Sequence, residues 1–344
     1  MAKSYDAGKV VDGSGWICLH RNENHFIGSD WMDHALAGDR SIKYTSYPDP
    51  FSAELRDRLA KLYEVSVSNI YVGNGSDGVL ADIFALLRQT HSEINLPQVG
   101  YKVYDILASR LNFGVNRYVS GLNRGEINSF SGLSVIDSPN AVTGSTVKAE
   151  LIDEVSATAD NFVIWDNCYG DFESKQLDVA GKLSNMAVVR SFSKYYGLAG
   201  LRIGYCIASA EMVSALDRSK DVYNVNVVAQ SLAARALDDA NQFEAFSARM
   251  LRVRNELQQR LVTLGFHVVE PHGNFIFASH PAVSGADLQA RLESHQILVR
   301  RFDYPEISNW LRITVPAESD LDRVREALQA ACTIENRLQL SAGE

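Results

Sequence analysis

One loop of the sequence gathers hydroxyl, amine and guanidinium groups. It lies between two apolar runs, Ala187–Arg190 and Ile203–Ala208, which we expect to be strands. Its polar residues are Ser191, Ser193, Lys194 and Arg202. A lysine amine can form a Schiff base with a carbonyl compound when its surroundings disfavour the charged form. Hydroxyls and an arginine bind a phosphate dianion well. The loop therefore indicates carbonyl chemistry beside an anion site, although a solvated surface lysine fits the same letters.

A second candidate group follows the apolar run Phe162–Trp165. Asp166 and Tyr169 place a carboxylate and a phenol where this expected strand ends. Open α/β sheets bind ligands at the carboxyl ends of their strands. A carboxylate there could keep a pyridine nitrogen protonated. Taken alone, Asp166 as a helix cap and Tyr169 as a packing residue are equally compatible with the pattern.

The segment Gly73–Gly78 matches the pattern G-x-G-x-x-G between an expected strand and an expected helix. Free N–H groups and the helix dipole favour an anion at such a turn. A dinucleotide-binding fold also needs an acidic residue at the end of the next strand, about 20 residues further on. Here that strand ends Asn95-Leu96-Pro97, and Glu93 lies near its start. Binding of NAD and a plain structural turn both stay open as alternatives.

These groups need a scaffold that brings strand ends together. From residue 53 onward, short apolar runs alternate with helical patterns, which is typical of a mostly parallel sheet covered on both faces. We expect about seven strands, at Ile70–Val72, Glu93–Leu96, Val115–Val119, Leu133–Ile136, Phe162–Trp165, Ala187–Arg190 and Ile203–Ala208. We expect helices at Ala53–Tyr63, Val79–Gln89, Tyr104–Asn112 and Asn226–Asp238.

A long, charged and periodic segment, Gln242–Leu264, predicts a helix that leads to a smaller α+β domain. Its expected strands are Gly265–Glu270, Phe275–Ala278, Ile297–Arg300 and Trp310–Val315, and its expected helices are Gly285–His295 and Leu321–Leu338. We therefore expect an α/β protein with an N-terminal segment at 1–30, a large domain at 31–241 and a small C-terminal domain at 242–344.

Composition narrows the classes of function. The 344 residues are 46% hydrophobic and 22% charged, which suits a globular chain with room for about two domains. A formal net charge of −9 makes a broad face for nucleic acid or anionic lipid unexpected. We expect a cytoplasmic protein, because neither a long apolar stretch nor a signal-peptide pattern occurs. The four cysteines and eight histidines lack the spacing of a metal site.

In order and spacing, these motifs resemble the fold-type I, pyridoxal-phosphate-dependent aminotransferases, and within them the histidinol-phosphate aminotransferases. The likeness runs from Tyr5 to about Val315. It rests on Tyr5-Asp6-Ala7-Gly8-Lys9, Asn22-Glu23-Asn24, Tyr47-Pro48-Asp49, Gly75-Ser76-Asp77, Tyr101, Ser138-Pro139-Asn140, Asp166 with Tyr169, Ser193-Lys194 with Arg202, and Arg300 with Arg312. The resemblance implies pyridoxal 5′-phosphate as cofactor, an L-amino acid and a 2-oxo acid as substrates, and a homodimer with shared active sites.

The resemblance also implies roles for single residues. Lys194 would join the cofactor covalently and move the proton at the α-carbon of the substrate. Asp166 would pair with the pyridine N–H, Tyr169 would donate to the phenolic oxygen, and Tyr101 would stack on the ring. The cofactor phosphate would be held by Ser76, Asp77, Ser191, Ser193, Arg202 and, from a second subunit, Tyr47.

For the substrate, the resemblance implies that Arg312 binds the α-carboxylate through two parallel hydrogen bonds. Tyr5 and Arg300 match positions that face the phosphate-bearing end of the substrate in the subfamily, and Asn22 is a further candidate for substrate binding.

One motif departs from the family. Its N-P-T-G is here Ala141-Val142-Thr143-Gly144, with Asn140 one place early. An alanine side chain donates no hydrogen bond to the phenolic oxygen of the cofactor. Tyr169 would then be the main partner of that oxygen, unless the loop brings Asn140 to it.

Several alternatives remain at this stage. The same cofactor also supports decarboxylation, elimination and cyclisation, since a fold does not define one reaction. A non-catalytic protein that binds pyridoxal phosphate and an NAD-dependent dehydrogenase are the two readings from other classes.

Overall fold

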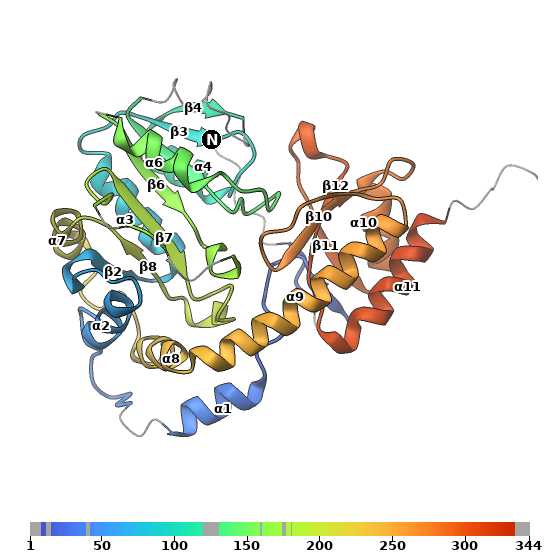
Figure 1. The fold of residues 1–344 in the computed structure, drawn as a ribbon, viewed down its shortest axis with the longest axis horizontal. Helices are drawn as coiled ribbons and strands as arrows, with labels where there is room; N and C mark the ends of the chain where they lie inside the picture. Colours follow the sequence, from blue (N-terminus) through green and yellow to red (C-terminus); the bar gives the residue numbers. More distant parts are fainter. Residues whose placement is uncertain are drawn as a thin grey trace, which may run out of the picture.

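The computed structural model describes residues 8–11, 15–38, 42–119, 131–158, 160–173, 177–179 and 181–333. Two sheets, one of seven strands and one of five, organise the described chain. In Figure 1 they lie in separate parts of the molecule, and the long helix α9 (Ala240–Thr263) runs from one part to the other. The predicted α/β class and the central sheet of seven strands are confirmed.

The larger sheet has the strand order β2-β8-β7-β6-β5-β3-β4. Its strands are β2 (Ile70–Gly73), β3 (Glu93–Pro97), β4 (Gly114–Tyr118), β5 (Leu133–Asp137), β6 (Phe162–Asp166), β7 (Met186–Ser191) and β8 (Gly204–Ile207). Neighbours are parallel from β4 to β7, and β8 is antiparallel to both β7 and β2. Every residue of β5 and β7 is buried, as expected for parallel strands with both faces covered.

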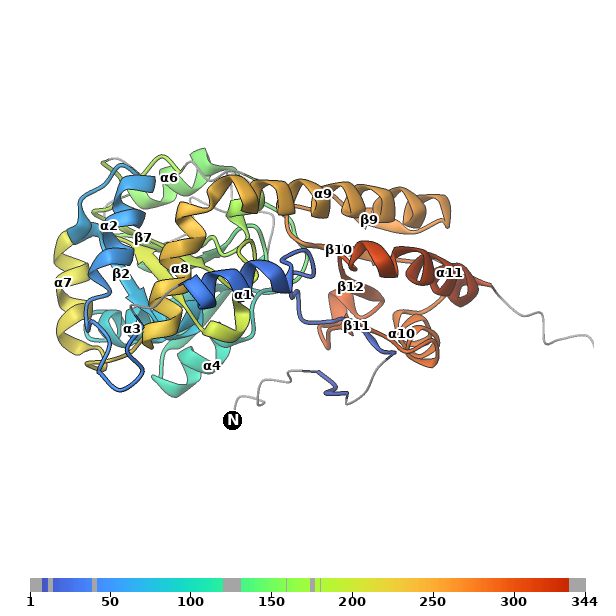
Figure 2. The same cartoon turned by 90° about the horizontal axis from the view of Figure 1, so that it is seen from below.

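Helices cover both faces of this sheet, as Figure 2 shows for α6 on one side and α4 on the other. The helices of this part are α1 (Ser29–Gly38), α2 (Ala53–Leu62), α3 (Gly75–Leu87), α4 (Val103–Arg110), α6 (Ala149–Ala157), α7 (Ala210–Ser219) and α8 (Val227–Asp238). Three of them, α1, α6 and α7, were not predicted. The predicted start of the second helix at Val79 is wrong, because α3 already begins at Gly75.

The sheet order also decides the meaning of Gly73–Gly78. Four strands, β8, β7, β6 and β5, separate β2 from β3. A dinucleotide-binding unit needs the two strands around its glycine turn to be neighbours, so that the acidic residue after the second strand reaches the ribose. The turn between β2 and α3 therefore lacks the geometry that the NAD alternative requires.

The smaller sheet has the order β1-β11-β12-β10-β9. Its strands are β1 (Ile17–Leu19), β9 (His267–Val269), β10 (Phe275–Ser279), β11 (Ile297–Arg301) and β12 (Trp310–Thr314), and its helices are α9, α10 (Gly285–Ser294) and α11 (Leu321–Cys332). Strand β1 was not predicted, and it pairs in parallel with β11. The predicted last helix ends earlier than expected, at Cys332, and residues 334–338 of that prediction lie outside the described residues.

Single turns of 3₁₀ helix connect these elements at Val67–Asn69, Gly170–Phe172, Ala199–Leu201, Pro305–Ile307 and Glu318–Asp320. Among the described residues, none of the helices combines the length and the apolar character that a membrane crossing requires.

Candidate active site

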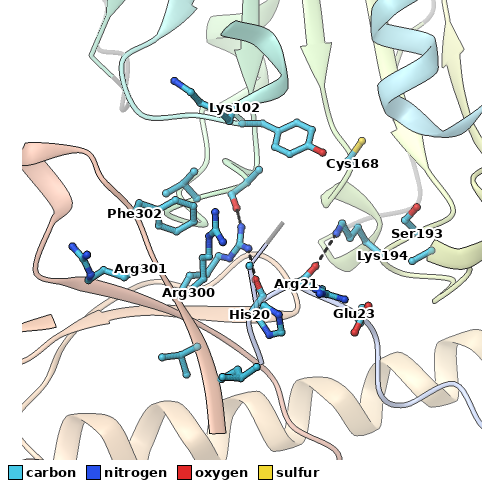
Figure 3. Close-up of a pocket in the computed structure, with 18 of the residues that line it drawn as sticks. His20, Arg21, Glu23, Lys102, Cys168, Ser193, Lys194, Arg300, Arg301 and Phe302 are labelled. Atoms are coloured by element: carbon cyan, nitrogen blue, oxygen red, sulfur yellow. Dashed lines mark hydrogen bonds between the residues drawn. The ribbon is translucent and has the colours of Figure 1, made fainter. Parts of the chain in front are cut away.

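A cavity of about 1280 Å³ lies where both sheets and the N-terminal segment meet. From the larger sheet and its loops, the predicted residues that line it are Ser76, Asp77, Tyr101, Asp166, Tyr169, Ser191, Ser193, Lys194 and Arg202. From the smaller sheet, they are Arg300 and Arg312. Figure 3 shows Lys194 and Ser193 on one side of this cavity and Arg300 on the other. Residues far apart in the sequence thus converge at the carboxyl ends of β6 and β7.

The cavity contains a cradle for an anion at the N-terminus of α3. The close approach of β8 to this turn requires glycine, because a Cβ on Gly204 would lie 2.4 Å from the backbone nitrogen of Ser76. Gly75 has φ +71°, and a Cβ there would meet Arg202 at 2.7 Å. Ser191 Oγ accepts the N–H of Ser193 at 3.1 Å, so the hydroxyl proton of Ser191 can point elsewhere. Helix amides, two hydroxyls and a guanidinium therefore face one corner.

Asp77 organises this corner through its side chain. Its Oδ2 accepts from Arg202 Nη2 at 2.9 Å, and its Oδ1 accepts from the Tyr101 hydroxyl at 3.0 Å. The carboxylate therefore fixes both the guanidinium beside the helix terminus and the aromatic ring above the cavity. Asp77 can bind an anion in the cradle only through its backbone N–H, because its carboxylate repels negative charge.

Asp166 is a buried carboxylate that receives neutral donors. The Tyr104 hydroxyl donates to its Oδ2 at 2.6 Å, and the backbone N–H of Cys168 donates to its Oδ1 at 3.2 Å. Burial raises the pKa of Asp166, and the two hydrogen bonds oppose that rise. Burial together with the charge of Asp166 also raises the pKa of Asp137 on the neighbouring strand. A cationic ring nitrogen placed against Asp166 would favour its ionised form.

Tyr169 is held by Asn22, which corrects one expectation. Asn22 Nδ2 donates to the Tyr169 hydroxyl at 2.8 Å, and Asn22 Oδ1 accepts from Thr314 Oγ1 at 3.1 Å. Asn22 is 1% exposed and is not part of the cavity wall. The predicted role of Asn22 as a substrate ligand is therefore replaced by contact with Tyr169.

Lys194 lies beside Tyr169 in the wall of the cavity. Its Nζ is 5.5 Å from the centre of the Tyr169 ring and donates a long hydrogen bond, 3.5 Å, to the backbone oxygen of Arg21. Figure 3 marks this bond. The backbone of the lysine is fixed separately, because Asn24 Nδ2 donates to the carbonyl oxygens of Lys194 and Tyr195. The amine thus lines the cavity from a loop whose backbone is hydrogen-bonded to Asn24.

Asn140 does not reach the cavity, contrary to its predicted role as a cofactor ligand. Its Nδ2 donates to the carbonyl of Val99 at 3.0 Å, and its Oδ1 accepts from the amides of Val142 and Thr143. The side chain therefore builds the turn, and Ala141 lines the cavity in its place.

The two arginines of the smaller sheet lie directly opposite each other, with Arg300 on β11 and Arg312 on β12 as Cα partners. The ring of Phe302 lies 5.7 Å from the Arg300 guanidinium and 5.1 Å from that of Arg312. Arg312 also donates to the carbonyl oxygens of Ala141 and His20. Like charges in this register destabilise a sheet, so the pair indicates a site for anions.

Two predicted residues lie elsewhere. Tyr47 is 81% exposed and stacks on Tyr223 with ring centres 4.4 Å apart, outside the cavity wall of its own chain. Tyr5 lies outside the described residues. Among the residues that the structure describes, no cluster of three His, Cys, Asp or Glu side chains suits a metal ion.

A buried ion pair beneath the site was not predicted. Arg190 Nη1 and Asp171 Oδ1 are 2.7 Å apart, and both side chains are 1% exposed. Arg190 also donates to the Tyr63 hydroxyl at 3.2 Å. Asp171 comes two residues after Tyr169, and Arg190 directly precedes Ser191, so the pair joins the two loops that carry the site. The sequence does carry one signal for this pair, because Arg190 is a charged residue within the apolar run of β7.

Comparison with known proteins places this geometry in a family. Residues 17–330 match the family model described as aminotransferase class I and II. The chain belongs to the class I and II aminotransferase family. It is 32% identical over 332 residues to the histidinol-phosphate aminotransferase of Microcystis aeruginosa, with 95% of each chain covered. It is therefore an aminotransferase of fold type I that uses pyridoxal 5′-phosphate, as the resemblance implied.

Solved structures show the same fold. The histidinol-phosphate aminotransferase of Sinorhizobium meliloti, solved in complex with pyridoxal-5′-phosphate, superposes with a TM-score of 0.81 at 20% identity and covers 92% of this chain and 90% of its own. The L-threonine-O-3-phosphate decarboxylase of Porphyromonas gingivalis superposes with a TM-score of 0.79 at 22% identity and covers 91% and 98%. Both a transferase and a decarboxylase thus share this aminotransferase's architecture.

Proposed function

We propose that this aminotransferase takes the amino group from an L-amino acid or amine that carries a distal anionic group, in the manner of histidinol phosphate, and passes it to a 2-oxo acid. The observation that carries this proposal is the pair of arginines Arg300 and Arg312, which are Cα partners on β11 and β12 and both line the cavity. Figure 3 shows Arg300 across this cavity from Lys194. The curated relative at 32% identity is named for the same class of substrate.

The residues of the cavity fit the cofactor. The cradle at the N-terminus of α3 suits its phosphate, because amide, hydroxyl and guanidinium donors meet there. Asp166 suits its pyridine nitrogen, because a buried carboxylate with neutral donors is stabilised by a cation. The Lys194 amine lines the same cavity beside Tyr169. Tyr101, held by Asp77, would stack on the ring.

Each residue then has a task in the reaction. When bound, pyridoxal phosphate supplies the electron-withdrawing ring that stabilises negative charge at the substrate α-carbon. Lys194, whose Nζ lies in the cavity wall beside Tyr169, would take up the proton from the substrate α-carbon and return it to the neighbouring carbon supplied by the cofactor aldehyde. Tyr169 would donate a hydrogen bond to the phenolic oxygen of the cofactor. Asp166 keeps the ring nitrogen protonated.

Substrate selection belongs to the basic wall of the cavity. Basic side chains on the wall are Lys9, Arg21, Lys102, Lys194, Arg202, Arg300, Arg301 and Arg312, and acidic ones are Glu23, Asp77, Asp166, Glu293 and Asp303. The planar guanidinium of Arg312 suits the α-carboxylate or the equivalent end of the substrate. Arg300, with the segment that contains Tyr5, would face the distal anion.

A homodimer completes the proposal. Tyr47, Phe51, Val222 and Tyr223 are all exposed apolar side chains, and Tyr47 stacks on Tyr223. Lys220 joins their two segments, because its amine lies over the Phe51 ring and donates to the carbonyls of Pro50 and Val222. Large exposed apolar side chains in one area mark an interface. In the dimer, Tyr47 would reach the cofactor phosphate of the second subunit. We also propose that the enzyme works in the cytoplasm and has no nucleic-acid partner.

A substrate panel tests this function. The enzyme is loaded with pyridoxal phosphate and given phosphorylated and unphosphorylated amino donors with 2-oxoglutarate as acceptor, and mass spectrometry follows the products. We expect the donor's amino group to move to the acceptor and the phosphorylated donor to be preferred. Arg300→Gln should remove most of that preference while kcat for the unphosphorylated donor changes little. Release of carbon dioxide without amino transfer would instead assign the chain to decarboxylation.

A further inference from the structure

Asn22 is placed to control the hydrogen bonding of Tyr169. Its backbone has φ +56°, a left-handed conformation that asparagine tolerates better than most residues. Its backbone N–H donates to Thr314 Oγ1 at 3.0 Å, and its carbonyl accepts from Asn274 Nδ2 at 3.1 Å. The residue is thus anchored through its main chain as well as through its amide oxygen.

This anchoring fixes which atom faces Tyr169. Thr314 Oγ1 donates to Asn22 Oδ1 at 3.1 Å, so the NH₂ end of the amide is the end that meets the Tyr169 hydroxyl at 2.8 Å. A phenol has one proton to donate and lone pairs that accept. Because the Tyr169 oxygen accepts from Asn22, its own proton is free to point into the cavity.

We propose that Asn22 is a positioning residue that keeps Tyr169 a hydrogen-bond donor toward the phenolic oxygen of the cofactor. This inference rests on the proposed roles of the site and assigns to Asn22 a part that the sequence pattern did not. It matters in this chain because Ala141 lines the cavity and Asn140 is turned into its own loop, so neither side chain donates to that oxygen. The Tyr169 hydroxyl, oriented by the Asn22 amide, would therefore be the side-chain donor to that oxygen.

The test is a double-mutant cycle on the full-length enzyme. Asn22→Gly removes the amide and keeps the left-handed backbone, since glycine adopts positive φ without strain. Tyr169→Phe removes the hydroxyl, and the double variant completes the cycle. Asn112→Gly is the matched control, because Asn112 has the same φ of +56° and is exposed outside the cavity wall. Melting temperatures confirm that each variant is folded.

Two readouts are used besides activity. The first is the dissociation constant of pyridoxal phosphate, which Asn22→Gly should raise by about tenfold, and Tyr169→Phe by at least as much. The second is the pH midpoint of the absorbance change of the bound cofactor. It should move to higher pH in Asn22→Gly, because a weaker hydrogen bond to the phenolic oxygen disfavours its ionised form. Asn112→Gly should change neither quantity.

The decisive result is the coupling between the two residues. If Asn22 acts through Tyr169, the double variant binds the cofactor no worse than Tyr169→Phe alone, within about twofold, and shows no additional shift in midpoint. Independent, multiplicative losses would overturn the inference and leave the proposed function intact. Should Asn22→Gly not fold, Thr314→Val tests the same amide by releasing its oxygen. Failure of the unaltered enzyme to bind pyridoxal phosphate would instead overturn the proposed roles of the site.

Discussion

The buried ion pair of Arg190 and Asp171 should behave very differently when one partner is removed and when both are replaced. Both side chains are 1% exposed and their charged atoms are 2.7 Å apart. Removing one partner deprives the remaining buried charge of its counter-ion, which costs about 3–5 kcal/mol, whereas replacing both by apolar groups of similar volume is often nearly neutral. We therefore expect Arg190→Met and Asp171→Leu each to lower the free energy of unfolding by about 3–5 kcal/mol.

The double variant Arg190→Met/Asp171→Leu should lose far less than the sum of the single losses. The Tyr63 and Tyr205 hydroxyls hydrogen-bond to each other at 2.7 Å, so Tyr63 keeps a partner when Arg190 is gone. Urea denaturation of the four proteins gives the coupling energy. The exposed pair Lys61 and Asp57 serves as control, because removing it should change stability by less than about 0.5 kcal/mol. Additive losses at the buried pair would refute the reasoning.

Three further expectations concern the cofactor site. Tyr104→Phe should weaken binding of pyridoxal phosphate by roughly 10- to 100-fold. Loss of the hydrogen bond from Tyr104 raises the pKa of Asp166, so the acidic limb of the pH profile of kcat/KM should move to higher pH. Gly75→Ala should weaken pyridoxal phosphate binding by about tenfold, because the added methyl group meets Arg202 and strains the backbone at φ +71°. Binding of unphosphorylated pyridoxal, measured by fluorescence titration, should fall much less, because both changes lie at the phosphate cradle. Burial raises the pKa values of Asp137 and Asp166 in the folded protein, so their contribution to stability is present below the ordinary carboxyl pKa and is lost as pH rises through the raised values. Asp137→Asn should therefore gain melting temperature relative to the unaltered apoprotein as pH increases from 4 to 8, and a constant difference across that range would contradict the assignment.

The sequence predicted the larger sheet well because its strands are buried on both faces and read as continuous apolar runs. It predicted the start of α3 poorly, since Gly75 and Gly78 have low helix propensity. That turn of helix exists because Gly204 on β8 lets the backbone pack against Ser76. Helix α7 was not predicted, although its N-cap residue is visible in the sequence. The side chain of Ser209 accepts a hydrogen bond from the N–H of Met212.

The residues of the cavity were predictable as a set, whereas the partners that orient them were not. Asn22 contacts Tyr169 across 147 positions of sequence, and no local pattern records such a contact. Tyr104 reads as the first residue of an amphipathic helix, and only the fold turns its hydroxyl to Asp166. Asn140 was a candidate ligand because it stands one place before the position of the family's asparagine, but its amide oxygen accepts from the backbone of its own turn.

The N-terminal segment sets a limit on movement between the two sheets. Leu19 at the end of β1 is paired with Val299 in the smaller sheet, and Asn24 is bonded to the loop of Lys194 beside the larger one. Only five peptide steps join these anchors, and a fully extended chain of that length reaches about 17 Å. This short tether restrains how far the two halves can separate without breaking a hydrogen bond at Lys194.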